Sequence, residues 1–431
     1  MYRKITAFLE AWKKNQYRKP LVLQGARQVG KTYSVLEFGR INYENVAYFN
    51  FETNPKLNRT FEENISPDYL IPILSHISGQ TIVKEKTLII FDEVQLCERA
   101  LTSLKYFCED ASDYHIIVAG SLLGVAVNRA KFSFPVGKVD MKTMYPMDME
   151  EFMIAMGEEK LATQVRQCFE TNTAMPSALH DAAMQLYRQY LVVGGMPECV
   201  LQFAQTRDYI LIRNTQDTIL ASYLNDMSKY NNLNEIKKTR LAYDNITVQL
   251  SKKNTRFQYK LIKKGGRASE FENAIEWLCL SGIVSQVYRI EQIKKPLENY
   301  RDIDAFKIYV SDLGLLCAKK DLSANDILYM AEELNDFKGG MAENYVNVQL
   351  SINGYHTYYW ESARGAEIDF VIQRNEQLIP IEVKSADNTR AKSLKVYMET
   401  YDPEYAIKLS AKNFAFEDNK KTVPLYAAFC I

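Results

Sequence analysis

Short apolar runs separated by helix-like segments organise the first 145 residues. The run at residues 88–91 is apolar without interruption, which is typical of a strand buried on both faces of a parallel sheet. Between the runs, apolar residues recur at helical spacing. The four runs are 21–23, 46–51, 88–91 and 115–119. Strands that alternate with helices predict an α/β domain over residues 1–145.

The middle of the chain has a mostly helical pattern. From residue 147 to 227, apolar and aromatic residues cluster at helical spacing, which predicts a helical domain over residues 146–230. More helical patterns follow, and then two strand-like runs at 283–288 and 306–310. Helices followed by two short strands predict a winged helix over residues 231–325.

The last hundred residues predict a further α/β domain, over residues 335–431. Two adjacent glycines, Gly339 and Gly340, are expected to open a helix. Two strand-like runs then flank a turn at Asn375, so they should form an antiparallel hairpin. These runs are 367–372 and 378–384.

Composition and charge fit a soluble globular protein of several domains. The 431 residues are 47% apolar and 25% charged, and at ~150 residues per domain this length gives two to four domains. The 53 basic and 53 acidic residues cancel, so overall charge points to neither a nucleic acid nor a membrane. The chain begins without a signal-peptide pattern, and its seven scattered cysteines and four histidines favour no disulfide framework and no structural zinc site. We therefore expect a cytoplasmic protein without a membrane partner.

A glycine-rich loop joins the first predicted strand to a helix. Its sequence, GARQVGKT, fits the pattern GxxxxGK[ST], whose backbone N–H groups and following helix start face a polyanion. Lys31 is expected to reach the β- and γ-phosphates of ATP, and the Thr32 hydroxyl to bind Mg²⁺. The candidate nucleotide-binding residues are Gly25, Ala26, Arg27, Gln28, Val29, Gly30, Lys31 and Thr32. The loop thus predicts ATP and Mg²⁺ as cofactors.

Polar residues stand at the ends of the third and fourth strands. Asp92 is placed to hold Mg²⁺ through water, and Glu93 to polarise the attacking water. Ser121 follows the fourth strand and has two interpretations: it senses the γ-phosphate or orients the water, or it caps the next helix. With Lys31, Glu93 and Ser121 are the candidate catalytic residues.

At these motifs the chain resembles the AAA-type P-loop ATPases of bacteria and archaea that carry a C-terminal domain of unknown function. The matching segments are GARQVGKT (25–32), LIIFDE (88–93), AGS (119–121), FPVGKV (134–139), YPMDMEEF (145–152) and GGMPE (194–198). The resemblance implies a RecA-like parallel-sheet core followed by a helical lid. Many relatives have Gly-Arg where this chain has Gly137-Lys138, so Arg129 and Lys138 are the candidates for a cation acting across the interface of a homo-oligomer.

Basic residues with interleaved aromatic residues gather within the predicted winged helix. The cluster contains Lys252, Lys253, Arg256, Lys260, Lys263, Lys264 and Arg267. One interpretation is contact with DNA. The other, which we favour, is a solvated face or a module for protein docking, because a winged helix does not fix a function.

Two acids and a lysine mark the C-terminal hairpin as a candidate metal-dependent site. Glu382 and Lys384 point to one face of the second strand, and Asp369 lies on the first. Asp369, Glu382 and the Val383 carbonyl would hold Mg²⁺, and Lys384 would stabilise the attacking water. Glu343, on the preceding helix, would complete the site.

This order of residues resembles the PD-(D/E)xK nuclease superfamily, over roughly residues 340–431. The resemblance implies a restriction-endonuclease-like α/β fold and cleavage of phosphodiesters. The alternative is a domain that keeps the fold for interaction and does not cleave.

The sequence as a whole predicts a multidomain α/β protein. Its parts are a RecA-like P-loop ATPase core, a helical lid, a winged helix and a nuclease-like C-terminal domain. ATP would drive or gate an action on a partner, with DNA and another protein as the candidates. Two rival functions stay open: an ATP-gated, metal-dependent DNA nuclease of a defence system, and a slow ATP-dependent switch that acts through protein contacts.

Overall fold

The four apolar runs of the first 145 residues form neighbouring strands of one parallel sheet. A computed structural model describes residues 1–431 except 122–124, 126–133, 230–232, 251–255 and 386–391. The strands pair in the order β2-β3-β4-β1-β5, and every pair is parallel. They are β1 (Leu21–Gln24), β2 (Asn45–Asn50), β3 (Thr87–Asp92), β4 (His115–Ala119) and β5 (Asp140–Thr143). The predicted α/β core is thereby confirmed.

Strand β5 has no counterpart in the sequence prediction. Its residues are mostly polar, and it lies at the edge of the sheet, where none of its four side chains is fully buried. An edge strand needs no continuous apolar run, so its pattern carries little signal.

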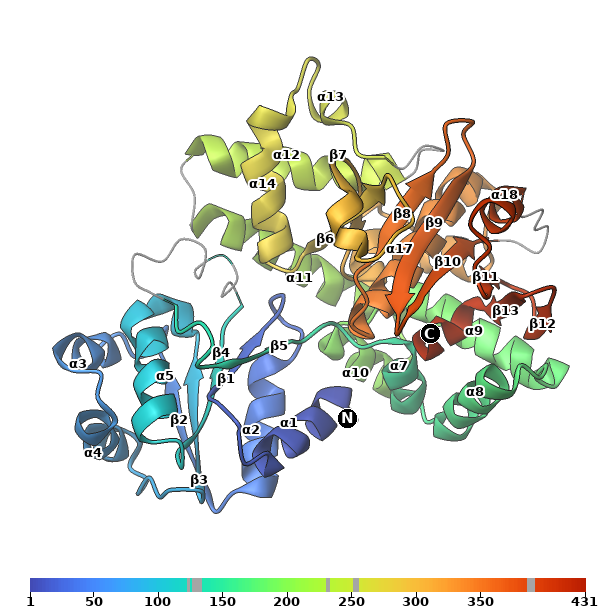
Figure 1. Ribbon diagram of the computed structural model, residues 1–431. Coiled ribbons are helices and arrows are strands. Elements are labelled where there is room, and N and C mark those ends of the chain that lie inside the picture. The colour runs from blue at the N-terminus through green and yellow to red at the C-terminus, as the bar shows by residue number, and fades with distance from the viewer. Residues whose placement is uncertain (122–124, 126–133, 230–232, 251–255, 386–391) are drawn as a thin grey trace. The chain divides into compact units, whose positions relative to one another are not determined.

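Helices cover both faces of this sheet (Figure 1). One face forms an apolar core with α3, α4 and α5, to which Phe61, Leu74 and Phe107 contribute. Helix α2 packs on β2, β3 and β4, and α1 packs on α2. The helices are α1 (Lys4–Lys14), α2 (Lys31–Asn42), α3 (Leu57–Glu63), α4 (Pro67–Ser78) and α5 (Glu98–Asp110), with a 3-10 turn η1 (Val94–Leu96). Together with residues Leu280–Gly282 they form the first of two units.

The second unit, residues Pro146–Cys279 and Ile283–Ile431, begins with five helices. They confirm the helical character predicted for residues 146–230. Asp148 starts the first of them through a capping box with Glu151, in which each side chain accepts the other residue's backbone N–H. The helices are α7 (Met149–Ala155), α8 (Glu159–Thr171), α9 (Ser177–Val193), α10 (Pro197–Thr206) and α11 (Tyr209–Lys229).

Three helices and two strands follow in the order expected of a winged helix, but the two strands belong to a larger sheet. Strands β6 and β7 form one end of an eight-stranded mixed sheet, in the order β12-β13-β11-β10-β9-β8-β6-β7. The sheet therefore runs across the predicted boundary between 325 and 335, and a separate winged helix stays a prediction. The elements are α12 (Leu233–Leu250), α13 (Tyr259–Ile262), α14 (Ala268–Leu280), β6 (Val284–Ile290), η2 (Leu297–Tyr300) and β7 (Arg301–Val310).

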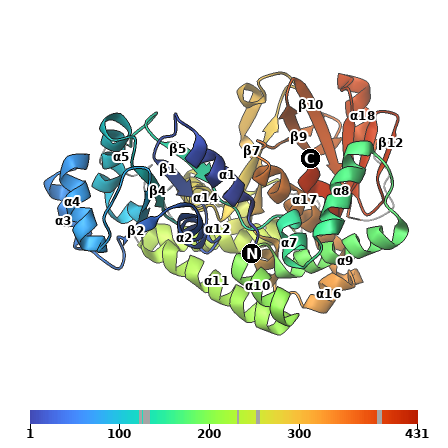
Figure 2. The ribbon, with the colours of Figure 1, turned by 90° about the horizontal axis from the view of Figure 1, so that it is seen from below.

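The rest of the sheet and its helices complete the second unit. Figures 1 and 2 both place the C-terminus beside α17, on which η4 packs. The strands are β8 (Tyr358–Glu361), β9 (Glu367–Arg374), β10 (Gln377–Val383), β11 (Ala406–Ser410), β12 (Ala415–Glu417) and β13 (Lys420–Pro424). The helices are α15 (Leu313–Lys319), α16 (Ala324–Leu328), η3 (Glu332–Leu334), α17 (Asn335–Ile352), α18 (Lys392–Tyr401) and η4 (Leu425–Cys430).

Two local predictions for this unit have different outcomes. Strands β9 and β10 form the expected antiparallel hairpin, with Asn375 in the left-handed conformation of a tight turn. The start of α17 was predicted wrongly, because the helix begins at Asn335 and runs through Gly339 and Gly340. A β-carbon on Gly340 would lie 2.1 Å from the Leu250 carbonyl oxygen, so this glycine allows close packing and does not break the helix.

In the described part of the chain, no helix is both long enough and apolar enough to cross a membrane.

Candidate functional site

The loop of residues 25–32 has the geometry of an anion-binding turn. It leaves β1 after Gln24 and enters α2 at Lys31, with Gly25, Gln28 and Gly30 at positive φ. Gly25 also permits close packing, because a β-carbon there would lie 2.1 Å from the Met144 carbonyl oxygen. At the start of α2 the free N–H groups and the helix dipole favour a negatively charged group.

Lys31 is buried at the start of α2, with 7% of its surface exposed. Its ammonium group donates hydrogen bonds to the carbonyl oxygens of Gly25 and Ala26, both at 2.8 Å. An ammonium group has three donors, and a phosphate oxygen is a stronger acceptor than a carbonyl. The loop thus holds a cation next to the N–H groups that would face a polyphosphate.

Thr32 and Asp92, which the sequence places 60 residues apart, meet at the tip of the sheet. The Thr32 hydroxyl donates to Asp92 Oδ2 at 2.9 Å, and Asp92 is 4% exposed. A hydroxyl and a carboxylate oxygen are the kinds of ligand that Mg²⁺ takes in proteins. The residues present here therefore fit a magnesium ion held between the loop and β3.

Tyr48, on β2, is a member of this site that the sequence prediction missed. Its phenol donates to the same Asp92 Oδ2 at 2.7 Å, and Asn50 donates to the phenol oxygen at 3.2 Å. Burial, together with Asp92, raises the pKa of Tyr48 to about 12 despite the opposing bond from Asn50, so the phenol stays a donor. The parallel pairing of β2 with β3, which sets Asn50 beside Asp92, is the signal that could have found it.

Glu93 and Ser121 also come together. Ser121 donates to Glu93 Oε2 at 3.4 Å, and Gln95 donates to the same oxygen. Glu93 has a left-handed backbone at φ 51°, which turns the chain away from the strand. The alternative role of Ser121 as a helix cap involves residues 122–124, outside the described residues, and Gln95 was not predicted.

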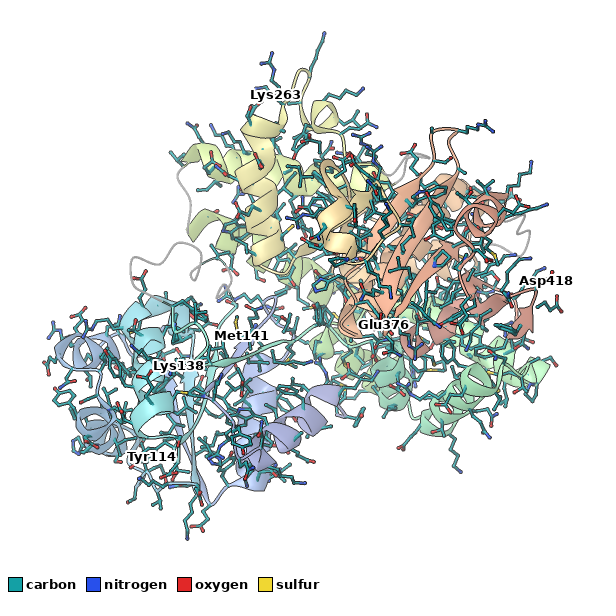
Figure 3. All side chains as sticks on the ribbon, viewed as in Figure 1. Tyr114, Lys138, Met141, Lys263, Glu376 and Asp418 are labelled. Carbon is teal, nitrogen blue, oxygen red and sulfur yellow. The ribbon has the colours of Figure 1, made fainter. Side chains whose placement is uncertain are left out.

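Of the two candidate cations for a subunit interface, only Lys138 lies in the described part of the chain. Its ammonium group pairs with Glu109 at 2.8 Å within the same unit, and both side chains are partly exposed (Figure 3). Arg129 lies outside the described residues.

Arg3 links the nucleotide loop to the end of the first unit. Its guanidinium donates to the Val29 carbonyl at 3.0 Å and to the Tyr145 carbonyl at 2.8 Å. Arg3 is 8% exposed, and Tyr145 is the last residue of this unit before the chain continues at Pro146. These contacts could not be predicted from the pattern of side chains, because both partners of Arg3 are backbone atoms.

The predicted nuclease-like residues lie in one region of the second unit, but other groups already bind them. Glu343 Oε2 accepts from Tyr309 at 2.8 Å and from Lys307 at 3.3 Å. Glu382 Oε1 pairs with Lys384 at 2.8 Å. Strand β7 thus contributes to a site that the sequence assigned to residues 335–431 alone.

The carboxylate of Asp369 also has a hydrogen-bond partner, in the backbone of the neighbouring strand. Its Oδ2 accepts from the Val383 N–H at 2.7 Å. Burial and then the charge of Glu343 raise its pKa to about 7, against the opposing effects of Lys307, Lys384 and the Val383 bond. Near neutral pH this carboxyl is therefore partly protonated.

These residues fit a divalent metal less well than the P-loop site does. No group of three or more His, Cys, Asp or Glu side chains in the described ranges is placed to hold a metal ion. One oxygen, Glu382 Oε2, is buried without a hydrogen-bond partner among the described residues. One carboxylate oxygen without a partner is fewer than the several acid ligands that the sequence predicts for a metal ion at this site.

A buried aspartate holds the GGMPE segment of the second unit. Asp312, 2% exposed, accepts backbone N–H groups of Gly195 at 2.6 Å and of Leu315 at 2.8 Å. Burial raises the pKa of Asp312 to about 6, while the N–H donors act in the opposite direction. The side chain therefore fastens this segment to the start of α15.

The basic cluster is only partly described. Lys252 and Lys253 lie outside the described residues. Lys263, labelled in Figure 3, pairs with Glu270 at 3.1 Å, and Arg256 donates to the Asp304 carbonyl at 3.4 Å. Part of the cluster is therefore engaged within the protein.

Comparison with known protein families supports the assignment of the first unit. A family model described as an AAA domain matches residues 17–153, which include the loop, Asp92, Glu93 and Ser121. The N-terminal part of the chain is thus similar to AAA domains. Two models described as domains of unknown function, DUF8612 and DUF4143, match residues 184–326 and 338–428. Neither description bears on the winged helix or the nuclease-like fold, which stay predictions.

Three solved structures with some similarity to this chain illustrate the range of matches. They are a Walker-type ATPase, PABY2304, of Pyrococcus abyssi (13% identity, 73% of this chain and 94% of that chain, TM-score 0.44), the ORC2 protein of Aeropyrum pernix (10%, 76% and 95%, 0.38) and the RuvB Holliday junction branch migration motor of Thermotoga maritima (14%, 65% and 87%, 0.29). Scores this low add nothing to the assignment, which rests on the AAA domain match and the loop itself. No curated protein matches the chain.

Proposed function

We propose that this protein binds ATP with Mg²⁺ and hydrolyses it, and that the nucleotide cycle acts on a partner. The observation that carries the proposal is the hydrogen bond between Thr32 and Asp92, which brings the two predicted Mg²⁺ ligands together at the end of the loop that holds Lys31. When bound, Mg²⁺ would neutralise charge on the β- and γ-phosphates.

Each residue of the site has a proposed task. The loop N–H groups and Lys31 bind and orient the phosphates, and Thr32 and Asp92 hold the metal ion. Glu93 orients the attacking water and draws its proton, and Ser121 fixes the carboxylate of Glu93. The bond from Ser121 to Glu93 Oε2 supports this last role, because it restrains the carboxylate beside the loop.

The partner is proposed on weaker grounds than the hydrolysis. DNA is the candidate because Lys260, Lys263, Lys264 and Arg267 form a local cationic stretch. The pairing of Lys263 with Glu270 supports the protein-docking alternative for part of it. We also propose a cytoplasmic location and a homo-oligomer as the assembly in which the cycle operates.

A measurement of turnover tests the main proposal. Purified full-length protein is assayed for Mg²⁺-dependent phosphate release with single-stranded DNA, double-stranded DNA and no DNA, beside Lys31→Ala as the inactive control. Turnover that requires Mg²⁺ and Lys31 supports hydrolysis, and stimulation by either DNA identifies the partner class. If wild type and Lys31→Ala release phosphate equally slowly, the protein is not an ATPase through this site.

Of the two rival functions, the contacts of Glu343 favour the slow switch over the ATP-gated nuclease. Tyr309 and Lys307 occupy the oxygen of Glu343 that would help to hold a metal ion. Nicking of supercoiled DNA with Mg²⁺ or Mn²⁺, with and without ATP, separates the two. Cleavage that Asp369→Asn abolishes would establish the nuclease.

A further inference from the structure

Lys307 is a lysine that the protein buries completely among acids. It lies on β7, is 1% exposed, and its ammonium group contacts Glu343 and Glu367, the latter on β9. The same group lies 5.1 Å from the centre of the Tyr359 ring. Strand β7 precedes residues 335–431 in the sequence, and the lysine meets this region because β7 packs on α17 and is linked to β8 through β6.

A buried ammonium group must be compensated by its surroundings. Removing a charge from water costs several kcal/mol unless opposite charges and hydrogen bonds replace the lost hydration. Burial lowers the pKa of Lys307, but Glu343, Tyr309, Glu367 and Asp369 together outweigh it and raise that pKa well above its ordinary value. The contacts with Glu343 and Glu367 place the Lys307 ammonium group between two carboxylates of this region.

The carboxylates around Lys307 are those that a nuclease-like site would use for a metal ion. One oxygen of Glu343, Oε2, accepts hydrogen bonds from both Lys307 and Tyr309. Asp369 accepts a hydrogen bond from the Val383 N–H. Lys307 thus already places a positive charge beside the carboxylate of Glu343. This charge would repel an added divalent ion.

We propose that Lys307 supplies the positive charge that a divalent metal would supply in a nuclease-like site, so that this acidic region is held together by an internal cation and takes up no metal. Glu343, Glu367 and Lys307 then form a structural ion network. The proposal concerns the second unit and holds whether or not the first unit hydrolyses ATP.

The first test is metal-dependent stabilisation of the full-length, nucleotide-free protein. Melting temperatures are measured with and without Mn²⁺ and Mg²⁺ for wild type and for Asp369→Asn. A metal that binds the folded region raises the melting temperature by mass action. We expect equal metal-induced shifts in the two proteins, because any metal held by the P-loop site is common to both. A shift that Asp369→Asn removes would place a metal ion at Asp369 and Glu382, and would overturn the proposal.

The second test replaces the lysine itself. Lys307→Met keeps the length of the side chain and removes its charge, and Lys395→Met, at an exposed lysine of α18, is the matched control. We expect Lys307→Met to melt at a lower temperature than wild type and to be stabilised by Mn²⁺ more than wild type is. Adding Glu343→Gln to Lys307→Met should restore part of the loss, because it removes the unpaired acid.

The outcomes of this test are distinct. If Glu343→Gln lowers the melting temperature of Lys307→Met further, Lys307 does not compensate the negative charge of Glu343. The proposal then fails. If Lys307→Met does not fold, the double variant and the comparison of wild type with Asp369→Asn still decide the question.

Discussion

Tyr48 and Asp92 are joined by a hydrogen bond of 2.7 Å, in which the phenol donates to the carboxylate oxygen that also accepts from Thr32. The bond connects the tips of two neighbouring parallel strands, β2 and β3. Asp92 therefore approaches the P-loop with its orientation fixed from two sides. Outer-shell partners of this kind orient metal ligands in many proteins.

Replacement of Tyr48 by phenylalanine should weaken the use of Mg²⁺ without affecting the fold. Loss of an outer-shell hydrogen bond commonly costs about 10- to 100-fold in metal affinity, so the Mg²⁺ concentration for half-maximal ATPase activity should rise by that order. Titration of Mg²⁺ at saturating ATP measures it. Tyr17→Phe, at an exposed tyrosine, is the control and should behave as wild type. An unchanged Mg²⁺ requirement would show that Tyr48 is only a packing residue.

Lys31→Ala should abolish tight ATP binding. It removes a charge-assisted contact worth about 1.5–3 kcal/mol, which corresponds to about 10- to 150-fold in the dissociation constant. Isothermal titration calorimetry with ATP and Mg²⁺ measures the loss, and Lys14→Ala, at an exposed lysine at the end of α1, serves as the control. Unchanged affinity in folded Lys31→Ala would remove the basis for a P-loop nucleotide site.

Glu93→Gln should separate binding from turnover. The amide keeps the shape of the side chain but cannot accept a proton, so turnover should fall by about 10²- to 10⁴-fold while ATP affinity is retained. Single-turnover hydrolysis combined with a nucleotide-binding measurement shows both effects. Glu10→Gln, on the exposed side of α1, controls for the change of charge. Equal turnover in wild type and Glu93→Gln would mean that another residue activates the water.

Arg3→Ala should destabilise the first unit and loosen the nucleotide loop. The buried carbonyl of Val29 and the partly buried carbonyl of Tyr145 lose their guanidinium donor, and the loss at a buried carbonyl costs about 1–3 kcal/mol. The melting temperature of the nucleotide-free protein should fall by several degrees. Arg3→Lys should recover less than half, because an ammonium group lacks the fork that reaches both carbonyls. Full recovery by lysine would show that only the charge of Arg3 matters.

The titration of Asp312 should make the stability of the folded protein depend on pH. Its pKa is about 6 in the folded protein and 3.8 in the unfolded chain, so between these values the folded state binds more protons. The stability that this group contributes is therefore fully present below about pH 4 and is lost as the pH rises through about 6.

Melting temperatures at pH 5 and pH 7.5 check this dependence. Asp312→Asn should lose the corresponding part of the pH response, and it should also be less stable, because its NH₂ group meets backbone N–H donors. Asp418→Asn, at the exposed turn labelled in Figure 3, is the control. An identical pH response in Asp312→Asn and wild type would assign the dependence to other groups.

Much of the first unit could be predicted from the sequence, because its central strands β1, β3 and β4 are buried on both faces. Residues 88–91 are fully buried in β3, and such continuous apolar runs carry a strong signal. The loop 25–32 was recognisable because its glycines and Lys31 follow directly from the geometry of phosphate binding. Strand β5 was missed, because a polar edge strand resembles a loop in its pattern.

The residues missed at the two sites share a physical reason. Arg3 binds backbone carbonyls, and Tyr48 depends on the register of β2 against β3. The contacts of Lys307 depend on the order of β7, β6, β8 and β9 in the larger sheet. Local periodicity contains none of this information. The wrong start of α17 has a related cause, since Gly340 is explained only by the nearby Leu250 carbonyl.

The eight-stranded sheet, which includes β6 and β7, also limits where the chain could be divided into separate fragments. A break in the chain between residues 310 and 335 would separate Lys307 from Glu343 and would leave β8 without β6, its neighbour on that side. The freed strand edge would invite pairing with other chains. A fragment that begins near residue 335 should therefore be less stable alone than together with β6 and β7.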